Sequence, residues 1–439
     1  MSKSLHLLLL VAFVSIRPIH AAETNTVSLA RCFAEVISSN AEILTFRKDV
    51  ERAAGTKLEL RSRDLPQLAA ELSAGWRAGA LFGNNSRYAL ITAEFSQPLF
   101  NSGIAATWRR GQCEVIAAQQ RLNLSVSDRL HELRTYYLRA QRLQQLIALY
   151  EEIDQRLQAN VTGEQQRRDA GMTGPRPTLQ ARVQLLSERA DLTAYRREEF
   201  EMRTRLAELM GRSMSELPRP AEASAHENGA LDLPALAKLA QERRADLKFL
   251  RALIQMATED RRVVDAGYFP FVSLVGSTLY IPGKRQITAV TPIIEGQTPL
   301  ATEGRYGVSL SWQIVDNGQV TGASRQVDGV RQEYEITLRQ LEENIPRQLA
   351  RAGHAMEDAE ARLAALDKSR AEAEEYLSVT ENRVSLGEAT QLDFSDAQRH
   401  LLDVRSGIVE ARFQYDSALA ELDWITGRYL EFAAPEPER

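Results

Sequence analysis

The chain has 439 residues, with 54 Lys and Arg against 59 Asp and Glu and a formal net charge of −5. This length suits two or three domains of ~150 residues each. The charge balance gives no support to nucleic-acid binding, which requires a basic surface. After the N-terminus no run approaches the ~20 apolar residues of a membrane-spanning helix, so the sequence is not that of a helical membrane protein.

The first segment, residues 1–21, has the pattern of a signal peptide. Lys3 precedes an apolar stretch from Leu5 to Val14, and small residues follow near Ala21 and Ala22. A buried core helix is the alternative, but the position and the flanking residues favour an export signal. We therefore expect the mature chain to work outside the cytoplasm.

The spacing of the glycines indicates an internal duplication. The interval from Gly103 to Gly171 is 68 residues and that from Gly318 to Gly387 is 69, while Gly171 to Gly211 and Gly387 to Gly427 are both 40. Coincidental glycines would not keep these intervals. We predict a first repeat at 22–211, a linker at 212–230, a second repeat at 231–427 and a C-terminal tail at 428–439.

Each repeat contains a predicted β-hairpin, at about 67–100 and about 270–315. Between Leu68 and Phe82 every even position is apolar, which is the alternation of a strand. Aromatic residues gather where we expect the strand ends. One predicted rim holds Phe82, Tyr88, Tyr280 and Tyr306, and the other holds Phe100, Tyr268, Phe269, Phe271 and Trp312.

Long strands with an apolar face and two aromatic rims are typical of an outer-membrane barrel, although an ordinary half-buried sheet is the alternative. Four strands cannot close a barrel, and an open sheet would leave unpaired backbone in lipid. If the strands span a membrane, several chains must therefore share one barrel.

Long helices are predicted for most of the remaining sequence. Residues 104–170 contain no proline. A heptad seam follows in the second repeat, with apolar residues at Leu401, Val404, Ile408, Ala411, Tyr415, Ala418, Leu422 and Ile425. Helices of ~65 residues reach about 100 Å, far more than a globular domain needs. Pro346 interrupts the corresponding helix of the second repeat, and we expect a kink there.

The sequence contains no recognisable catalytic, cofactor or metal motif. His131, His226, His354 and His400 lack ligand spacing. We therefore expect no enzyme activity, no cofactor and no metal site. For the two cysteines, Cys32 and Cys113, we expect no disulfide, because the helix layout places them about 35 Å apart in height.

Several segments resemble the TolC-type outer-membrane channels of drug efflux and type I secretion. They are VSLARCFAEVISSNAEI at 27–43, its counterpart LDLPALAKLAQERRADL at 231–247, QPLFNSG at 97–103 and RVSLGEATQLDFSDAQRHLLDV at 383–404. The resemblance implies a mainly α fold with a β-barrel part, in which a homotrimer forms a twelve-stranded barrel and a periplasmic α-barrel. It also implies docking to a periplasmic adaptor protein and an inner-membrane pump, in contact with outer-membrane lipid.

The resemblance also implies roles for particular residues. Asp393 and Asp396 correspond to aspartates that ring the narrow periplasmic end of the channel. The alternative role for both is that of helix N-terminal carboxylates favoured by the helix dipole. The adaptor would dock near Arg167–Gly171 and Arg383–Gly387, and Pro98, Gly103 and Gly318 mark the strand-to-helix junctions.

This chain departs from the family pattern at some of these positions. Gln313 stands where the first repeat has Pro98, and Pro177 stands where the second repeat has Asp393. Ala389 occupies a position where some relatives have an arginine that holds the gate shut. We therefore expect closure to depend on other contacts.

Two functions fit the sequence. The first is a passive exit duct in the outer membrane of a Gram-negative bacterium, serving tripartite efflux or type I secretion. The second is a periplasmic coiled-coil adaptor or scaffold without a membrane barrel. The two helical hairpins and four strands favour the duct, because an adaptor would normally show one hairpin flanked by β-rich modules.

Overall fold

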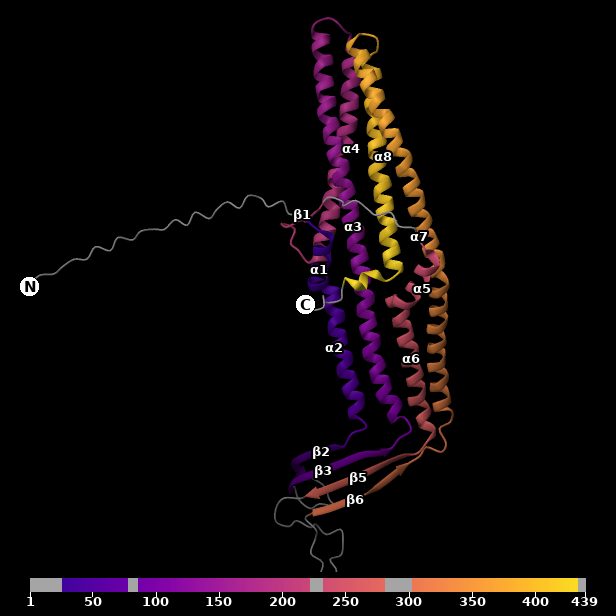
Figure 1. Ribbon diagram of the computed structural model, residues 1–439. Coiled ribbons are helices and arrows are strands. Elements are labelled where there is room, and N and C mark those ends of the chain that lie inside the picture. Colours follow the sequence, from indigo (N-terminus) through magenta and orange to yellow (C-terminus); the bar gives the residue numbers. More distant parts are fainter. Residues whose placement is uncertain (1–25, 78–85, 222–231, 281–301, 433–439) are drawn as a thin grey trace, which may run out of the picture.

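A computed structural model describes residues 26–77, 86–221, 232–280 and 302–432 of the chain. The predicted signal peptide and Phe82 lie outside the described residues. Long helices stand on a small sheet at one end and turn back at two tips at the other end (Figure 1).

The same order of elements occurs twice along the chain. The first series is β1 (Thr26–Val27), α1 (Leu29–Ser39), α2 (Ala41–Ser62), β2 (Gln67–Arg77), β3 (Ser86–Phe100), α3 (Ile104–Asp169) and α4 (Pro175–Met210). The second is β4 (Arg219–Pro220), α5 (Leu233–Arg243), α6 (Ala245–Asp265), η2 (Ala266–Tyr268), β5 (Phe271–Tyr280), β6 (Thr302–Ser311), α7 (Gln319–Ser385) and α8 (Gln391–Ile425), followed by η3 (Arg428–Glu431).

The four long strands form one antiparallel sheet in the order β2-β3-β5-β6. Apolar residues alternate along β2, and Leu68, Leu72 and Trp76 are 76%, 70% and 66% exposed on one face. The fold class predicted from the sequence is confirmed, with two differences in detail. β6 ends at Ser311 rather than near residue 315, and Tyr306 pairs with Gly276 in the middle of β5 rather than at a rim.

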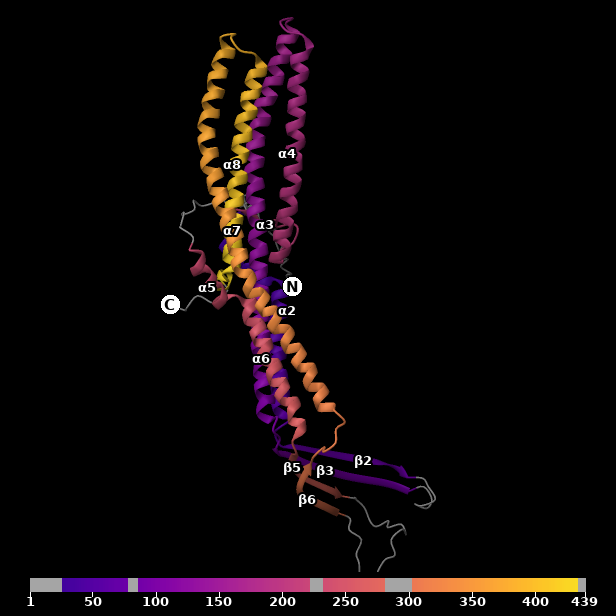
Figure 2. The same ribbon diagram turned by 90° about the vertical axis from the view of Figure 1, so that its right-hand side faces the viewer.

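The helices form a wall with two tiers. In the tier next to the sheet, contacts run in the order α2-α3-α6-α7 (Figures 1 and 2). In the tier next to the tips the order is α4-α3-α8-α7. The helices α3 and α7 run through both tiers, and α3 contacts both α6 and α8 of the second series. None of the helices in the described ranges is apolar over enough length to cross a membrane.

The heptad seam of α8 faces its neighbours, as its spacing predicts. Seven of its eight residues are buried, and Val404 is half-buried. Ile425 is fully buried at the end of the seam. Burial of such a stripe stabilises a helix that would be marginal in water by itself.

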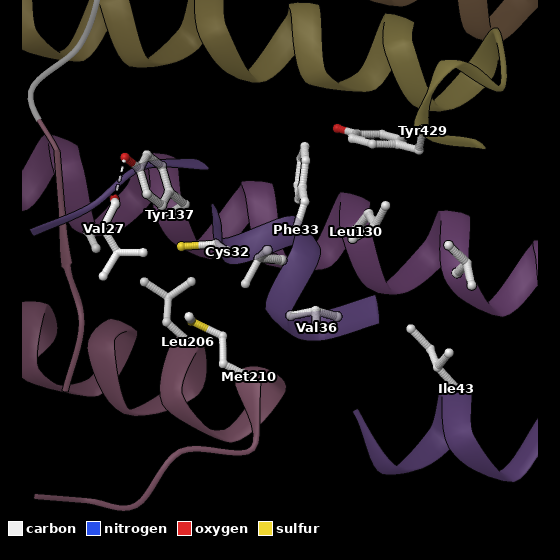
Figure 3. Close-up of a cluster of buried hydrophobic side chains, with 13 residues drawn as sticks. Val27, Cys32, Phe33, Val36, Ile43, Leu130, Tyr137, Leu206, Met210 and Tyr429 are labelled. Atoms are coloured by element: carbon white, nitrogen blue, oxygen red, sulfur yellow. Dashed lines mark hydrogen bonds between the residues drawn. The ribbon is translucent and has the colours of Figure 1, made fainter. Parts of the chain in front are cut away.

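A core between the two tiers joins the start of the chain to its end. The buried residues of this core are Val27, Cys32, Phe33, Val36, Ile43, Val126, Leu130, Leu133, Tyr137, Ala140, Leu206, Met210 and Tyr429 (Figure 3). The hydroxyl of Tyr137 donates to the carbonyl of Val27 at 3.1 Å and accepts from the amide of Ala221 at 3.0 Å. Tyr137 therefore fixes both strands of the small β1-β4 pair to α3. Cys32 and Cys113 are free thiols.

Pro346 lies inside α7, which remains one helix from Gln319 to Ser385. The ribbon of α7 changes direction in the region where α5 crosses it (Figures 1 and 2). Proline has no N–H for the carbonyl four residues earlier, and its ring crowds that carbonyl. A proline inside a helix is a common cause of such a change of direction.

Candidate gate, tips and strand-to-helix junctions

Both helical hairpins turn at a glycine in the left-handed conformation. Gly171 has φ of +74° and Gly387 has φ of +77°. The amide of Met172 donates to the carbonyl of Arg167, and the amide of Glu388 donates to the carbonyl of Arg383, at 2.9 and 2.8 Å. This is the Schellman arrangement, in which glycine is favoured because it has no side chain to strain. The tip glycines of the sequence prediction are therefore helix-ending residues.

Asp393 forms a capping box at the start of α8. Its Oδ2 accepts from the amide and from the hydroxyl of Thr390, both at 2.7 Å, and its own amide donates to Thr390 Oγ1 at 3.2 Å. The bonds from Thr390 hold the pKa of the Asp393 carboxyl below its ordinary value. Asp393 is therefore charged and held in place at neutral pH.

Asp396 lies one turn further along α8 and lines a groove of about 580 Å³ between the two hairpins. The groove also contains Arg176, Pro177 and Arg399. The two aspartates thus have different surroundings, because Asp393 is bonded to the helix start and Asp396 faces a groove with cationic side chains.

Asn160 joins the hairpins beside this groove, and the sequence analysis did not single it out. Its Oδ1 accepts from Gln391 Nε2 at 2.8 Å, and its Nδ2 donates to Ser395 Oγ at 3.4 Å. Asn160 belongs to α3, whereas both partners belong to α8. No periodicity marks this residue, because a single polar contact between distant helices leaves no repeat in the sequence.

The first tip begins its returning helix differently from the second. Gly174 precedes α4 without a capping side chain, and Pro175 and Pro177 occupy its first turn. The first amides of a helix have no partner within the helix, so a proline there removes a donor that would need one. The two prolines therefore reduce the number of unpaired amides that a capping side chain would have to bind at the start of α4.

The arginines at the two tips also differ. Arg167 forms an ion pair with Glu164 at 3.3 Å, and the Glu164 side chain is 5% exposed. Arg383 lies near Asp393 and helps to keep its pKa low. The structure places each arginine in the last turn of its rising helix, and among the described contacts of the two only Arg167 forms an ion pair there.

The two strand-to-helix junctions share one local hydrogen bond, from the amide of a glycine to the side chain two residues before it. Asn101 Oδ1 accepts from the amide of Gly103 at 2.8 Å, and Asp316 Oδ1 accepts from the amide of Gly318 at 3.0 Å. Gly318 has φ of +86°. A Cβ on Gly103 would lie 3.0 Å from the Cβ of Ala266, so this junction packs too closely for a larger residue.

Pro98 sits where the sheet tolerates a residue without an N–H. It lies beyond the last β2 pair, Gln67 with Ser96, and at a shift in register with β5 between Pro98 and Phe100. Gln313 of the second series follows the end of β6 at Ser311, so no equivalent constraint applies there.

A polar network joins the two series midway along the wall. Arg134 on α3 binds Asp423 on α8 at 2.6 Å, and their side chains are 13% and 15% exposed. The indole N–H of Trp424 donates to Asp128 on α3 at 3.0 Å. Burial raises the pKa of Asp128 despite this bond.

The part of the chain that the structure describes contains no cluster of three or more His, Cys, Asp or Glu residues able to hold a metal ion. The residues described above form two helix turns, a capped helix start beside a groove, and two strand-to-helix junctions. Long paired helices that stand on a four-stranded antiparallel sheet define the fold class of this chain, and among the described strands of that sheet β2 and β6 each pair with one neighbour only.

Comparison with known proteins identifies the family. The profile of the outer membrane efflux protein family matches residues 33–212 and 236–428, and the chain belongs to this family. It is an outer membrane efflux channel of the TolC-like kind in tripartite efflux systems, and it extends into the periplasm. The family consists of channels rather than enzymes, and its channels form trimers. No curated protein matches the chain in sequence.

Solved structures share the fold at low sequence identity. VceC of Vibrio cholerae is 17% identical with a TM-score of 0.75, over 91% of this chain and 96% of that chain. The CmeC outer membrane channel of Campylobacter jejuni is 14% identical with a TM-score of 0.76, over 91% and 85%. The open state of the MtrE outer membrane channel of Neisseria gonorrhoeae is 18% identical with a TM-score of 0.71, over 91% and 88%.

Proposed function

We propose that three copies of this chain close into one passive duct, which opens at its tips when a periplasmic adaptor protein and an inner-membrane pump dock there. Three sheets of four strands would form a barrel of twelve strands in the outer membrane. The helices would form the periplasmic part of the duct. The pump would select the cargo, since the duct itself needs only a wall and a gate.

The observation that carries this proposal is that the sheet and both helical tiers each end in one element of the first series and one element of the second series. Among the described strands of the large sheet, β2 and β6 each pair with one neighbour only. In the helical tiers α7 forms one edge throughout, while α2 and then α4 form the other. A neighbouring copy can therefore add to sheet and helices by one and the same rotation.

The strand directions permit this closure. All three pairings within the sheet are antiparallel, so β2 and β6 run in opposite directions. β6 of one copy would meet β2 of the next in an antiparallel pair. A closed barrel leaves no unpaired edge in lipid.

The gate would lie at the tips, where Asp393 and Asp396 begin the returning helix. Three copies would bring six carboxylates towards one axis, and such a ring attracts cations and repels anions. Thr390 holds Asp393 in place, and Asn160 ties the start of α8 to the first hairpin. These contacts would take the place of the arginine that Ala389 replaces.

Docking near Arg167–Gly171 and Arg383–Gly387 would separate the tips. Both segments end their helices in the same arrangement and lie at the end of the molecule furthest from the sheet (Figure 1). An adaptor that binds the separated state better than the closed state would shift the channel towards opening.

Mass measurement of the channel in detergent tests the assembly. We expect a trimer. A monodisperse monomer that is soluble without detergent would contradict both the barrel and the duct.

Single-channel recording tests the gate. In the double variant Asp393→Ala and Asp396→Ala we expect weaker cation selectivity and weaker block by divalent or trivalent cations, with assembly intact. The matched control is Asp367→Ala with Asp403→Ala, which removes the same charge from α7 and α8 away from the tip. Equal effects of the two double variants would place the constriction elsewhere.

A further inference from the structure

Two positive charges lie on one side of α2 near the end that leads into the sheet (Figure 1). Lys57 and Arg61 are four residues apart, which is about one helical turn, and both are exposed. The guanidinium of Arg61 lies over the Trp108 ring of α3, with Cζ 5.5 Å from the ring centre. Neither Lys57 nor Arg61 has an ion pair among the described residues. We call Lys57, Arg61 and Trp108 the foot site.

Three neighbouring arginines are paired with carboxylates instead. They are Arg63 with Glu59 at 2.7 Å, Arg109 with Glu259 at 3.0 Å and Arg110 with Asp260 at 3.0 Å. Burial raises the pKa of the nearby Asp64 carboxyl, and the groups that oppose this rise are Trp108 and Arg63 rather than Arg61. Asp64 therefore does not neutralise Arg61.

The second series holds its equivalent residues in an internal ion pair. When the prolines before β2 and β5 are aligned, Lys57 corresponds to Arg261, and Arg61 corresponds to an acidic residue, Asp265. Arg261 Nε donates to Asp265 at 2.9 Å, and Asp328 of α7 binds the same guanidinium. Like charges at this spacing destabilise a helix, whereas opposite charges stabilise it. The foot site therefore favours an external anion, and its counterpart in the second series does not.

Trp108 points to the outer face of the wall. Val126 lies 18 residues further along α3, which is five turns of ~3.6 residues, so the two side chains project from the same side of the helix. Val126 is buried in the core that α1 covers. A layer formed by α1 and the β1-β4 pair would obstruct the inside of a duct, so the face that carries this layer is the outer one.

The foot site also lies at the depth of lipid headgroups when the sheet spans the membrane. Trp108 is the fifth residue of α3, about 6 Å from the start of the helix at ~1.5 Å per residue. A headgroup layer is roughly 5–8 Å thick on each side of the hydrocarbon core. Leu65 and Leu68 follow Arg61 towards the sheet and are 41% and 76% exposed. Cations at headgroup depth are thus followed by leucines at the depth of the acyl chains.

From these observations we propose that the foot site binds the phosphate of an anionic phospholipid in the inner leaflet of the outer membrane. This inference rests on the proposed barrel, which sets the depth of the site. A guanidinium stacked on a ring keeps the N–H groups in its plane available to phosphate oxygens, and Lys57 adds a second charge. Two cations favour a headgroup with a net negative charge, phosphatidylglycerol, over phosphatidylethanolamine, because they repel the ammonium group of the latter.

Native mass spectrometry of the purified channel measures this binding. The channel in a neutral detergent is titrated with phosphatidylglycerol or with phosphatidylethanolamine of the same acyl chains. We expect up to three molecules of phosphatidylglycerol on each trimer, bound at least about fivefold more tightly than phosphatidylethanolamine. Equal binding of the two lipids to an intact trimer would overturn the site and leave the proposed duct standing. Monomers alone in the same spectra would contradict the duct, and the site with it.

Substitutions of single charges locate the binding site. Arg61→Gln and Lys57→Gln should each weaken phosphatidylglycerol binding about fivefold, because each removes one positive charge near the membrane surface. The matched control is Arg63→Gln, which removes the same charge two residues from Arg61 but takes it from the existing pair with Glu59. Equal losses in Arg61→Gln and Arg63→Gln would show a general attraction to the end of α2 and would contradict the site.

The aromatic ring and the acyl chains are tested separately. Trp108→Leu should weaken phosphatidylglycerol binding with all charges kept, and Trp108→Phe should retain part of it, because phenylalanine keeps a ring face for Arg61. Unchanged binding in Trp108→Leu would exclude the ring from the site. Inorganic phosphate at the same concentration should not displace the lipid, since it has no acyl chains. Displacement would identify a general anion site and overturn the assignment to a lipid.

Discussion

The guanidinium of Arg134 lies 2.6 Å from the carboxylate of Asp423, and this ion pair joins the first series of elements to the second. Both side chains are largely buried, and Asp423 also accepts from Arg428 at 3.2 Å. The pair lies on the same level as Trp424 and Arg244, where α3, α6, α7 and α8 meet. The contacts that unite the two halves of the wall run along α3, which contacts α6 on the sheet side of this level and α8 on the tip side.

Removing one partner of this pair should cost substantial stability. We expect Arg134→Ala to destabilise the channel by about 3 kcal/mol, since it leaves a buried carboxylate with one weaker partner. Thermal denaturation in detergent measures the effect as a fall in Tm of several degrees. The matched control is Arg63→Ala, whose pair with Glu59 is about 60% exposed on both sides and should matter by less than ~1 kcal/mol. Equal losses for the two variants would contradict the role assigned to Arg134.

Two left-handed glycines should respond differently to the same substitution. Gly387 has open space around its Cβ position, so Gly387→Ala should cost only the ~1 kcal/mol of backbone strain. Gly427 has φ of +72°, and its Cβ would lie 3.2 Å from the backbone carbon of Arg243. Gly427→Ala should therefore lower the Tm clearly more than Gly387→Ala, and the reverse order would contradict the packing of α8 against α5.

Asp128 should tolerate loss of its charge but not loss of its acceptor. Burial raises its pKa, so its ionised form is disfavoured in the folded chain, and this cost is present above the folded pKa. Asp128→Asn removes the cost and keeps an oxygen for the Trp424 N–H. We expect its Tm at pH 7 to equal or exceed that of the unaltered channel.

The comparison variant is Asp128→Ala, which leaves the indole N–H of Trp424 without its partner. We expect a loss of ~1–2 kcal/mol, seen in the same melting experiment. A loss of the same size in Asp128→Asn would show that the negative charge itself is required there.

Asp393 should keep its charge under moderately acidic conditions. Its folded pKa is below the ordinary value of 3.8, so the stabilisation of the cap is complete above that value and is lost as the pH falls through the folded pKa. In an Asp396→Asn channel, reversal potentials should show that the remaining cation preference is constant from pH 7 to about pH 5. The preference should decline only below the ordinary carboxyl range.

The control for this titration is Thr390→Val, which removes the hydroxyl donor and keeps the shape of the side chain. The decline should then begin at a higher pH, because one of the bonds that favours the ionised carboxylate is missing. An identical pH profile in the two channels would contradict the cause assigned to the low pKa.

The sequence alone determined the elements that repeat. Alternating apolar residues predicted the strands that the structure places at Gln67–Arg77 and Ser86–Phe100, and the heptad spacing predicted the buried seam of α8. The proposed boundaries of the repeats and the roles of the tip residues stay predictions. The segments at 27–43, 97–103, 231–247 and 383–404 gave the family resemblance, which the family profile confirms. Positions that are buried at regular intervals carry apolar residues at the same intervals in the sequence. A helix end that requires the left-handed conformation favours glycine at that position.

Only the tertiary structure decided which solitary polar residues meet. Asn160 and Gln391 lie 231 positions apart, and Arg134 and Asp423 lie 289 apart. Nothing in the local sequence distinguishes Arg244 from the other arginines, yet packing buries it among α6, α7 and α8, where it contacts Asp246, Gln348 and Trp424. Each such contact is made once, between helices brought together by their apolar stripes, so it has no period in the sequence and follows from the fold alone.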